Sequence, residues 1–235
     1  MQIVNHRLDT AEWVPAADVR EEITPEAIVI HFTAGGKASG SIAWLTKQDD
    51  NYVSSHLVID RNGHVFQLAQ FNLRALHAGV SEWNGRTDLN SWSIGIELAN
   101  WGLLTANHDG GFVSWSGQPV AAANAREATH KNGLSGWWEV FSGLQTDSLV
   151  QVCRTLVATY GIRIIVGHDD VAPARKNDPG PLLDMTELRA LVFANDEPSI
   201  YRTECERCLA ETYDELTTAI NTVIGSVAVR RKGGA

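Results

Sequence analysis

The sequence predicts an α/β fold in which a mixed central β-sheet is flanked by helices. Three observations carry this prediction. Short β-branched runs bounded by turn residues indicate buried strands, and apolar residues at every third or fourth position indicate helices. A third is the composition, with 44% hydrophobic and 20% charged residues in a chain of 235, which is typical of a globular protein. The length favours one core with an appended segment over two equal domains.

The first predicted strand covers residues 27–32, which read Ala-Ile-Val-Ile-His-Phe. Its β-branched residues indicate burial, and His31 stands at its end. Residues 53–60 and 64–68 predict a hairpin, because the segment between them contains the Asn-Gly pair that favours tight turns.

Two more strands complete the predicted sheet. Residues 93–98 read Ser-Ile-Gly-Ile-Glu-Leu, and residues 162–166 are rich in isoleucine and valine. Glu97 interrupts the first of these otherwise apolar runs. A carboxylate in a buried strand needs a hydrogen-bond partner or a functional role, because burying it without one is costly.

Three helices are predicted around the sheet. Residues 37–48 predict a short one. Residues 145–160 carry apolar side chains at helical spacing and end at Gly161, a common C-terminal stop. Residues 184–194 predict the third.

Residues 101–142 are rich in Gly, Asn, Ser and Trp and show no sustained period. We therefore expect an elaborated loop region, of the kind that often shapes a binding cleft. Trp115, Trp137 and Trp138 are the candidate lining residues of this cleft.

A domain boundary is predicted at residues 195–198, which read Asn-Asp-Glu-Pro. It separates a first domain at 1–195, with its core at about 25–190, from a helical extension at 196–235. The extension carries one apolar stripe at helical spacing. Its members are Cys205, Leu209, Tyr213, Leu216, Ile220, Val223 and Val227. The stripe either packs on the core, which we prefer, or mediates self-association.

Charge and hydropathy exclude two classes of partner. The net charge of −9 and the lack of a basic stripe argue against nucleic acid. No apolar stretch reaches the roughly 20 residues of a transmembrane helix, so no transmembrane segment is expected.

Cys153, Cys205 and Cys208 are too few and too clustered for a disulfide framework. The CxxC formed by the last two is interpreted as two cysteines on a helix.

Two histidines and an aspartate from separate parts of the chain form a candidate zinc set. His31 ends one strand, His168 follows another, and Asp178 lies in a loop bounded by prolines. Three protein ligands leave the fourth tetrahedral position open for water, as in catalytic rather than structural zinc sites. Composition alone cannot select these residues among the eight histidines of the chain, so the choice depends on their context.

Four blocks of residues provide that context, in a fixed order along the chain. They are Ile28–His31, Arg74–Ser81 (Arg-Ala-Leu-His-Ala-Gly-Val-Ser), Asn90–Leu98 (Asn-Ser-Trp-Ser-Ile-Gly-Ile-Glu-Leu) and Val166–Pro181. Together they resemble the AmpD-like N-acetylmuramoyl-L-alanine amidases, a family shared with peptidoglycan recognition proteins and phage amidase lysozymes. The resemblance covers roughly residues 25–190, and four blocks in order are far more specific than one.

The resemblance implies a zinc hydrolase that cuts the amide bond between N-acetylmuramic acid and L-alanine in peptidoglycan or muropeptides. It implies that His31, His168 and Asp178 bind Zn²⁺, that Glu97 is the general base and that Lys176 faces the developing oxyanion. It also implies that the domain at 1–195 is catalytic.

Some residues depart from the pattern or carry no fixed role. Family members of the phage-lysozyme type have a thiolate ligand and lack the glutamate, so Asp178 and Glu97 match the AmpD pattern instead. His77 and Arg175 are candidates for substrate contact, with a structural role left open for each. His56 and His64 are interpreted as ordinary strand residues.

The sequence is also compatible with other functions and with several biological settings. A peptidoglycan-binding module of the same fold is the alternative, and a zinc hydrolase of another amide is a third reading. The N-terminal residues lack the pattern of a signal peptide, which predicts cytoplasmic synthesis, with release or non-classical export to the cell wall as the route outward. The chain is then a recycling enzyme, a phage endolysin or an exported toxin.

Overall fold

The computed structural model describes residues 1–16, 21–47 and 53–194, and its centre is a six-stranded mixed sheet. The strand order is β15-β4-β9-β5-β6-β3, in which β5 and β6 pair antiparallel and the other neighbours pair parallel. The strands are β3 (Glu12–Trp13), β4 (Ala27–Phe32), β5 (Leu57–Ile59), β6 (Val65–Gln67), β9 (Ser93–Leu98) and β15 (Ile164–Gly167). The predicted mixed sheet is confirmed.

Helices cover both faces of this sheet. They are α1 (Ala38–Leu45), α2 (Gly143–Tyr160), the short α3 (His168–Val171) and α4 (Met185–Phe193). Ile28 and Ile30 on β4 pack in one hydrophobic cluster with Leu149 and Leu156 of α2. Val58 of β5 packs with α1 in another cluster. Because successive strand residues point to opposite faces, one apolar run serves both layers.

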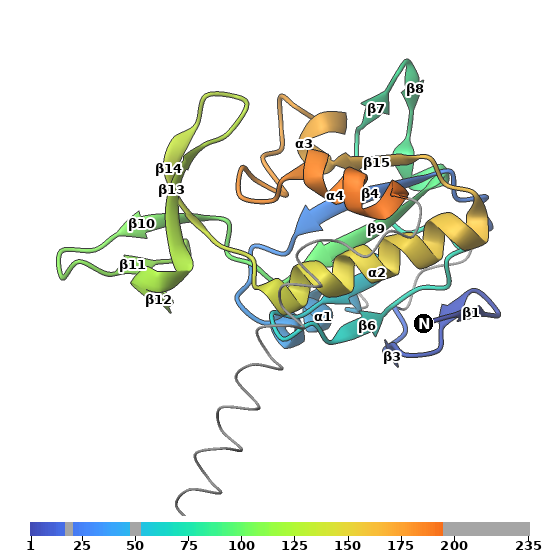
Figure 1. Ribbon diagram of the computed structural model, residues 1–235, viewed down its shortest axis with the longest axis horizontal. Coiled ribbons are helices and arrows are strands. Elements are labelled where there is room, and N and C mark those ends of the chain that lie inside the picture. The colour runs from blue at the N-terminus through green and yellow to red at the C-terminus, as the bar shows by residue number, and fades with distance from the viewer. Residues whose placement is uncertain (17–20, 48–52, 195–235) are drawn as a thin grey trace, which may run out of the picture. The chain divides into compact units, whose positions relative to one another are not determined.

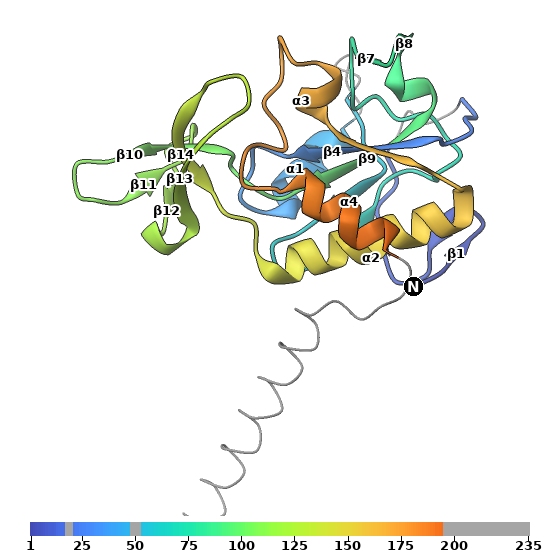
Figure 2. The ribbon, with the colours of Figure 1, turned by 45° about the horizontal axis from the view of Figure 1, so that its top comes forward.

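Local signals set the limits of the long helix α2. The Ser142 side chain accepts a hydrogen bond from the Gln145 backbone N–H at 3.2 Å, and Gly161 ends the helix with a φ of 69°. Helix α4 lies beside α2 (Figure 2), and the Arg154 side chain donates to the Leu191 carbonyl at 2.7 Å. The predicted helix-strand-helix order of this region is confirmed.

The prediction of a loop region at 101–142, called the insertion below, is wrong. These residues form an antiparallel sheet of five strands in the order β12-β11-β10-β14-β13. The strands are β10 (Leu103–Ala106), β11 (Phe112–Val113), β12 (Pro119–Val120), β13 (Ala125–Thr129) and β14 (Ser135–Glu139). Strands this short show no clear period in the sequence. Their turns do leave a signal, because Gly110, Gly117 and Gly133 follow polar residues and adopt positive φ.

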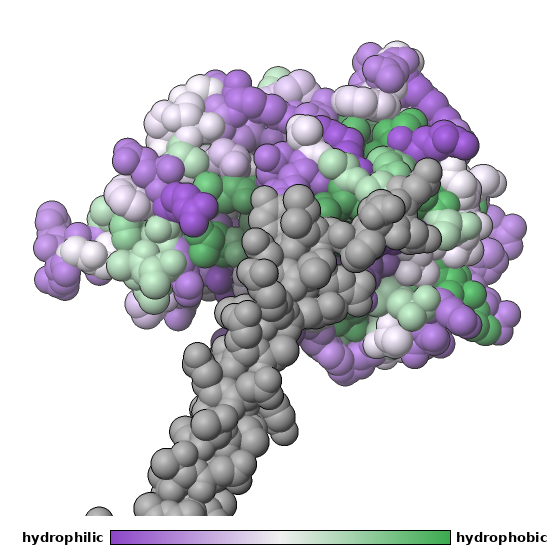
Figure 3. Space-filling view, viewed as in Figure 1, coloured by the Kyte–Doolittle hydropathy of each residue, from purple (hydrophilic) through white to green (hydrophobic). Residues whose placement is uncertain are grey.

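The insertion has a small apolar core of its own and stands beside the main sheet (Figure 1). Leu104, Phe112 and Val120 are buried in it, and the Trp137 ring lies 4.7 Å from that of Phe112. Hydrophobic residues gather over β11 and β12 on the face in Figure 3. The insertion is therefore an ordered wall rather than a loose segment.

Two short hairpins and two 3-10 turns complete the described fold. They are β1 (Ile3–Val4) with β2 (Arg7–Leu8), β7 (Glu82–Trp83) with β8 (Arg86–Thr87), η1 (Leu89–Ser91) and η2 (Ala122–Asn124). Met1–Phe193 form one compact unit. The predicted helical extension at 196–235, with Cys205 and Cys208, lies outside the described residues. Within the described ranges, no helix combines the length and apolarity needed to cross a bilayer.

Candidate active site

The parallel strands β15, β4 and β9 bring the predicted site residues to one edge of the sheet. His31 is the second-last residue of β4 and lies directly opposite Glu97 of β9. His168 follows the last residue of β15, which pairs with β4. Since the carboxyl ends of parallel strands meet at one edge, side chains at these ends converge.

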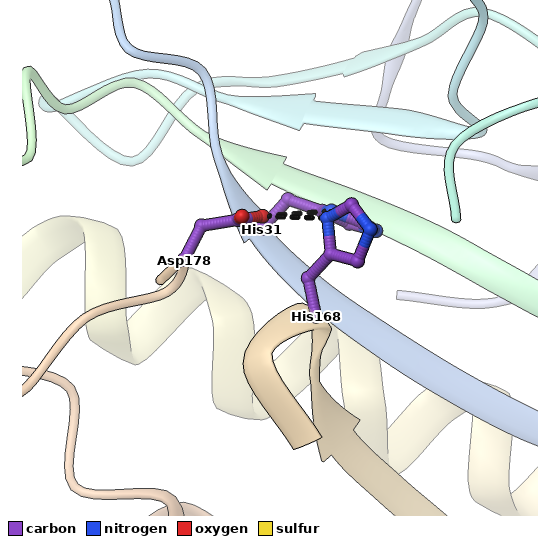
Figure 4. A group of neighbouring side chains, drawn as sticks. All are labelled: His31, His168 and Asp178. Atoms are coloured by element: carbon purple, nitrogen blue, oxygen red, sulfur yellow. Dashed lines mark hydrogen bonds and ion pairs between the residues drawn. The ribbon is translucent and has the colours of Figure 1, made fainter. Parts of the chain in front are cut away.

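His31, His168 and Asp178 meet in a tight, buried group (Figure 4). The Nδ1 atoms of the two imidazoles are 2.9 Å apart. The Asp178 Oδ2 atom lies 3.0 Å from Nδ1 of His31 and 2.9 Å from Nδ1 of His168. Ligands held about 2.0–2.1 Å from a tetrahedral zinc would be about 3.3 Å apart. The group is therefore close to the size that zinc requires.

The outer nitrogens of both imidazoles are already engaged. Nε2 of His168 lies 3.0 Å from the Ala78 carbonyl, so this nitrogen carries the proton and donates it. Nε2 of His31 lies 3.1 Å from Nδ1 of His77. Both Nδ1 lone pairs then face each other and the Asp178 carboxylate. Three converging acceptors fit a bound cation, and the outer hydrogen bonds orient them for it.

The pKa shifts of His31 and Asp178 also favour a metal site. Burial lowers the pKa of His31 to about 4, although the hydrogen bond with Asp178 opposes this. Burial alone raises the pKa of Asp178, but its close contacts with His168 and His31 outweigh burial and hold that pKa below its usual value. At neutral pH His31 is therefore uncharged and Asp178 is ionised, which are the protonation states that metal ligands need.

Glu97 carries a buried carboxylate oxygen that has no hydrogen-bond partner among the described residues. Burial raises the pKa of Glu97 to about 8, the charge of Asp178 raises it further, and Lys176 opposes the shift. Glu97 also lines the cavity that contains the histidine-aspartate group. A buried carboxylate oxygen without a hydrogen-bond partner lowers the stability of the fold, and in a cavity it is available to a ligand.

Two basic residues follow helix α3, between His168 and Asp178. Both Lys176 and Arg175 line the cavity. Nη2 of Arg175 donates to the carbonyls of Ala78 at 2.8 Å and Val80 at 2.9 Å. Arg175 thus holds in place the segment whose Ala78 carbonyl orients His168.

His77 packs against the candidate metal ligand His31, in space that is left by a glycine on β9. The sequence analysis did not single out this glycine. A Cβ atom on Gly95 would lie 2.4 Å from Cγ of His77, so only glycine at this position of β9 allows the imidazole to pack there. His77 contacts His31 directly and also lines the cavity. A role in orienting His31 and a contact with substrate are thus both compatible with its position.

His56 and His64 lie away from the candidate ligands, next to strands rather than in them. The buried His56 accepts a hydrogen bond from the Gly95 N–H at 3.0 Å and donates to the Leu73 carbonyl at 2.8 Å. His64 pairs with Glu12 at the surface. Neither lines the cavity, and each has a structural contact.

The sequence analysis did not predict one network of hydrogen bonds and ion pairs at the site. His130, in the turn between β13 and β14, bonds to Asp169 with 2.7 Å between Nε2 and Oδ2. Lys131 pairs with Asp169 at 2.9 Å and with Asp170. The Asp169 backbone N–H donates to the Asp178 carbonyl at 2.8 Å. The insertion is therefore bonded to the segment that carries two of the candidate ligands.

We expect His130→Ala to destabilise the protein by about 2–4 kcal/mol, because it removes one partner of a buried pair and leaves Asp169 undercompensated. Urea unfolding of the full chain measures this. Lys131→Ala is the matched control. The Lys131 side chain is 47% exposed, so its loss should cost less than about 1 kcal/mol. Equal losses in the two variants would refute a special role for the buried pair.

The candidate site lies in a cavity of about 1330 Å³. Its lining runs from His31 and Asp178 to residues of α1 and of the insertion. Trp115 lines it as expected. Trp137 packs on Phe112 instead, and Trp138 is buried with its Nε1–H donating to the Ala128 carbonyl.

Comparisons with known proteins agree on one family. A family model described as N-acetylmuramoyl-L-alanine amidase matches residues 21–181. The N-acetylmuramoyl-L-alanine amidase AmiD of Escherichia coli (strain K12) is 33% identical over 192 residues, which are 78% of this chain and 57% of AmiD. The 1,6-anhydro-N-acetylmuramyl-L-alanine amidase AmpD of Salmonella typhimurium (strain SL1344) is 34% identical over 142 residues, covering 60% of this chain and 57% of AmpD.

A solved structure is similar as well. It is the complex of E. coli AmiD with the substrate anhydro-N-acetylmuramic acid-L-Ala-D-γ-Glu-L-Lys, which superposes with a TM-score of 0.54 and 30% identity. The match covers 79% of this chain and 63% of that one. The chain thus spans less than two thirds of each of these relatives.

Proposed function

The chain belongs to the N-acetylmuramoyl-L-alanine amidase family, and on that basis we propose that it hydrolyses the amide bond between N-acetylmuramic acid and L-alanine with the help of bound zinc. One observation carries the proposal. Two imidazole nitrogens and a carboxylate oxygen converge within 3.0 Å of one another, in a cavity that is also lined by Glu97, whose buried Oε2 has no hydrogen-bond partner among the described residues.

His31, His168 and Asp178 would hold the metal. Zinc bound there supplies a Lewis acid for the amide carbonyl and for water. Neighbouring residues orient the ligands for the metal. His77 and the Ala78 carbonyl orient the two imidazoles, and Arg175 holds Ala78 in place. We propose that this ordering keeps the three ligands ready for the metal and leaves one coordination position free.

Glu97 carries the proton transfers in this proposal. As a carboxylate it accepts a proton from the attacking water, and as an acid it returns that proton to the leaving alanine nitrogen. Its pKa of about 8 in the metal-free site lies close enough to neutrality for both steps. Lys176 supports the reaction with a positive charge where the carbonyl oxygen becomes negative.

A peptidoglycan-binding module without catalysis explains these features less well. Binding alone needs neither three converging ligands nor the unpartnered Oε2 of Glu97, which costs folding free energy. The matching relatives are also named as amidases. These observations therefore favour a catalytic amidase over a binding module.

Product analysis tests the proposal directly. The protein with one zinc per chain should convert anhydro-N-acetylmuramic acid-L-Ala-D-γ-Glu-L-Lys, the ligand of the AmiD complex, into the free sugar and the intact tripeptide. Mass spectrometry identifies both products. Cleavage within the peptide, or no cleavage of this compound or of purified sacculi, would refute the proposed reaction.

A further inference from the structure

We propose that the cavity continues beyond the candidate active site as a glycan-binding groove, formed by α1, the loop before it and the insertion. The groove would hold the sugars that flank the muramic acid in a glycan strand. This inference rests on the proposed function, because that function places a muramic acid at the metal-binding end of the same cavity.

The size of the cavity is the first argument. Sites for a single small molecule usually enclose about 300–1,000 Å³, whereas this cavity has about 1330 Å³. It reaches Trp44 on α1 and the residues between β11 and β12 of the insertion. This space exceeds what one muramyl unit at the metal-binding end requires.

Trp115 of the insertion presents a fixed aromatic surface to this cavity. Its Nε1–H donates to the Ala34 carbonyl at 2.7 Å, yet the residue is 73% exposed. The hydrogen bond holds one edge of the ring while most of the side chain stays in water. A large exposed ring held in one orientation is unfavourable in the free protein and suits a ligand with an apolar face.

Trp44 presents a second aromatic surface, from α1. It is 55% exposed, and Nζ of Lys47 lies 5.5 Å from the centre of its ring. Both tryptophans belong to the cavity lining. Sugar rings have faces of C–H groups that stack on the negative face of an aromatic ring, so two such surfaces fit successive sugars.

The side chains around these tryptophans are mostly neutral. Hydroxyl and amide groups that can bond to sugar hydroxyls come from Ser39, Ser41, Ser116, Gln118 and Asn124. Among the described residues that line this part of the cavity, the charged ones are Lys37 and the Arg61–Glu139 pair, whose charges compensate each other at 3.0 Å.

The distribution of charged side chains indicates whether the groove suits a sugar or a peptide. The stem peptide carries carboxylates, and the cations that suit them, Arg175 and Lys176, are in the loop that also carries Asp178. A neutral wall of hydroxyl, amide and aromatic groups fits uncharged sugars better. The structure therefore favours a glycan over the stem peptide as the ligand of this groove.

Contacts between the insertion and the main sheet fix this wall in place. A Cβ atom on Gly36 would lie 2.4 Å from Nε1 of Trp101, so the Trp101 ring packs closely on the loop after β4. The Trp101 backbone N–H also donates to Glu139 at 2.7 Å. A groove that is already ordered binds its ligand without a large entropic cost.

Kinetics on two matched substrates test the groove. One is a single muramyl tripeptide, and the other is a tetrasaccharide of alternating N-acetylglucosamine and muramic acid that carries the same peptide. Trp115→Ala and Trp44→Ala should each lower the ratio of kcat/KM on the tetrasaccharide to that on the monomer by roughly 3- to 10-fold. Trp115→Phe should restore most of the ratio.

Trp13→Ala is the control, because Trp13 stacks with Arg7 and does not line the cavity. It should leave the ratio unchanged. Since both substrates are measured on the same preparation, partial unfolding cancels in the ratio. An unaltered ratio in both Trp115→Ala and Trp44→Ala would overturn the proposal, as would an equal fall in Trp13→Ala.

Binding without turnover separates the groove from the reaction. The tetrasaccharide without peptides should bind to Glu97→Gln protein in calorimetry, and the added Trp115→Ala change should weaken it by roughly 3- to 10-fold. If the wild-type protein cleaves neither substrate but this binding and its loss are observed, the groove stands and the amidase proposal fails. Unaltered binding after Trp115→Ala would refute the groove alone.

Discussion

Removal of the metal should abolish amide hydrolysis, and zinc added back should restore it. The reason is that His31, His168 and Asp178 converge as a set of metal ligands, but these side chains contain no group that can polarise an amide by itself. Metal analysis of the purified full chain should find about one zinc per chain. Dialysis against a chelator, followed by titration with zinc, measures the loss and its recovery. Full activity of metal-free protein would refute the zinc mechanism.

Ligand variants should locate the metal at this group. Asp178→Asn should lower both zinc content and turnover, because it replaces the charged carboxylate whose Oδ2 lies within 3.0 Å of Nδ1 of both imidazoles. His77→Ala should weaken zinc binding by about 10- to 100-fold, since it removes the outer hydrogen bond of His31. Asp147→Asn, at an exposed position of α2, is the control and should change neither quantity. Normal zinc content in Asp178→Asn would place the metal elsewhere.

Glu97→Gln should lower turnover by roughly 10²–10⁴-fold while zinc content stays the same. The amide keeps the shape of the side chain but neither accepts the proton of water nor passes it to the leaving nitrogen. Steady-state hydrolysis of the muramyl tripeptide, together with metal analysis of the same sample, measures the effect. An unchanged rate would show that another residue moves the proton.

Stability measurements separate this loss from unfolding. Because burial raises the pKa of Glu97 from 4.5 to about 8, the native state favours the protonated form. In metal-free protein the carboxylate therefore costs stability increasingly as pH rises from about 4.5 to 8. Glu97→Gln resembles the protonated form and should be at least as stable as the wild type at pH 8. Glu82→Gln, at an exposed position, should alter neither stability nor turnover.

The sequence by itself was sufficient for the local elements and for the candidate residues. The β-branched run at 27–32 and the apolar spacing at 145–160 predict a strand and a helix, and the structure places β4 and α2 there. These patterns are readable because neighbouring positions on one element share one environment. The four sequence blocks also indicated the family that the comparisons identify. The roles of Glu97, Lys176 and the metal ligands remain predictions. The convergence of His31, His168 and Asp178 and the unpartnered Oε2 of Glu97 support those of the metal ligands and of Glu97.

Tertiary structure alone decided how these residues meet. The pairing of β4 with β9 sets Glu97 opposite His31, and the hydrogen bond of His77 to His31 joins residues 46 positions apart. The bond of His130 to Asp169, and the wall that Trp115 forms, depend on an insertion whose strands are too short to leave a period in the sequence. Such contacts join segments with independent local patterns, so their partners are determined only when the sheet and the insertion pack together.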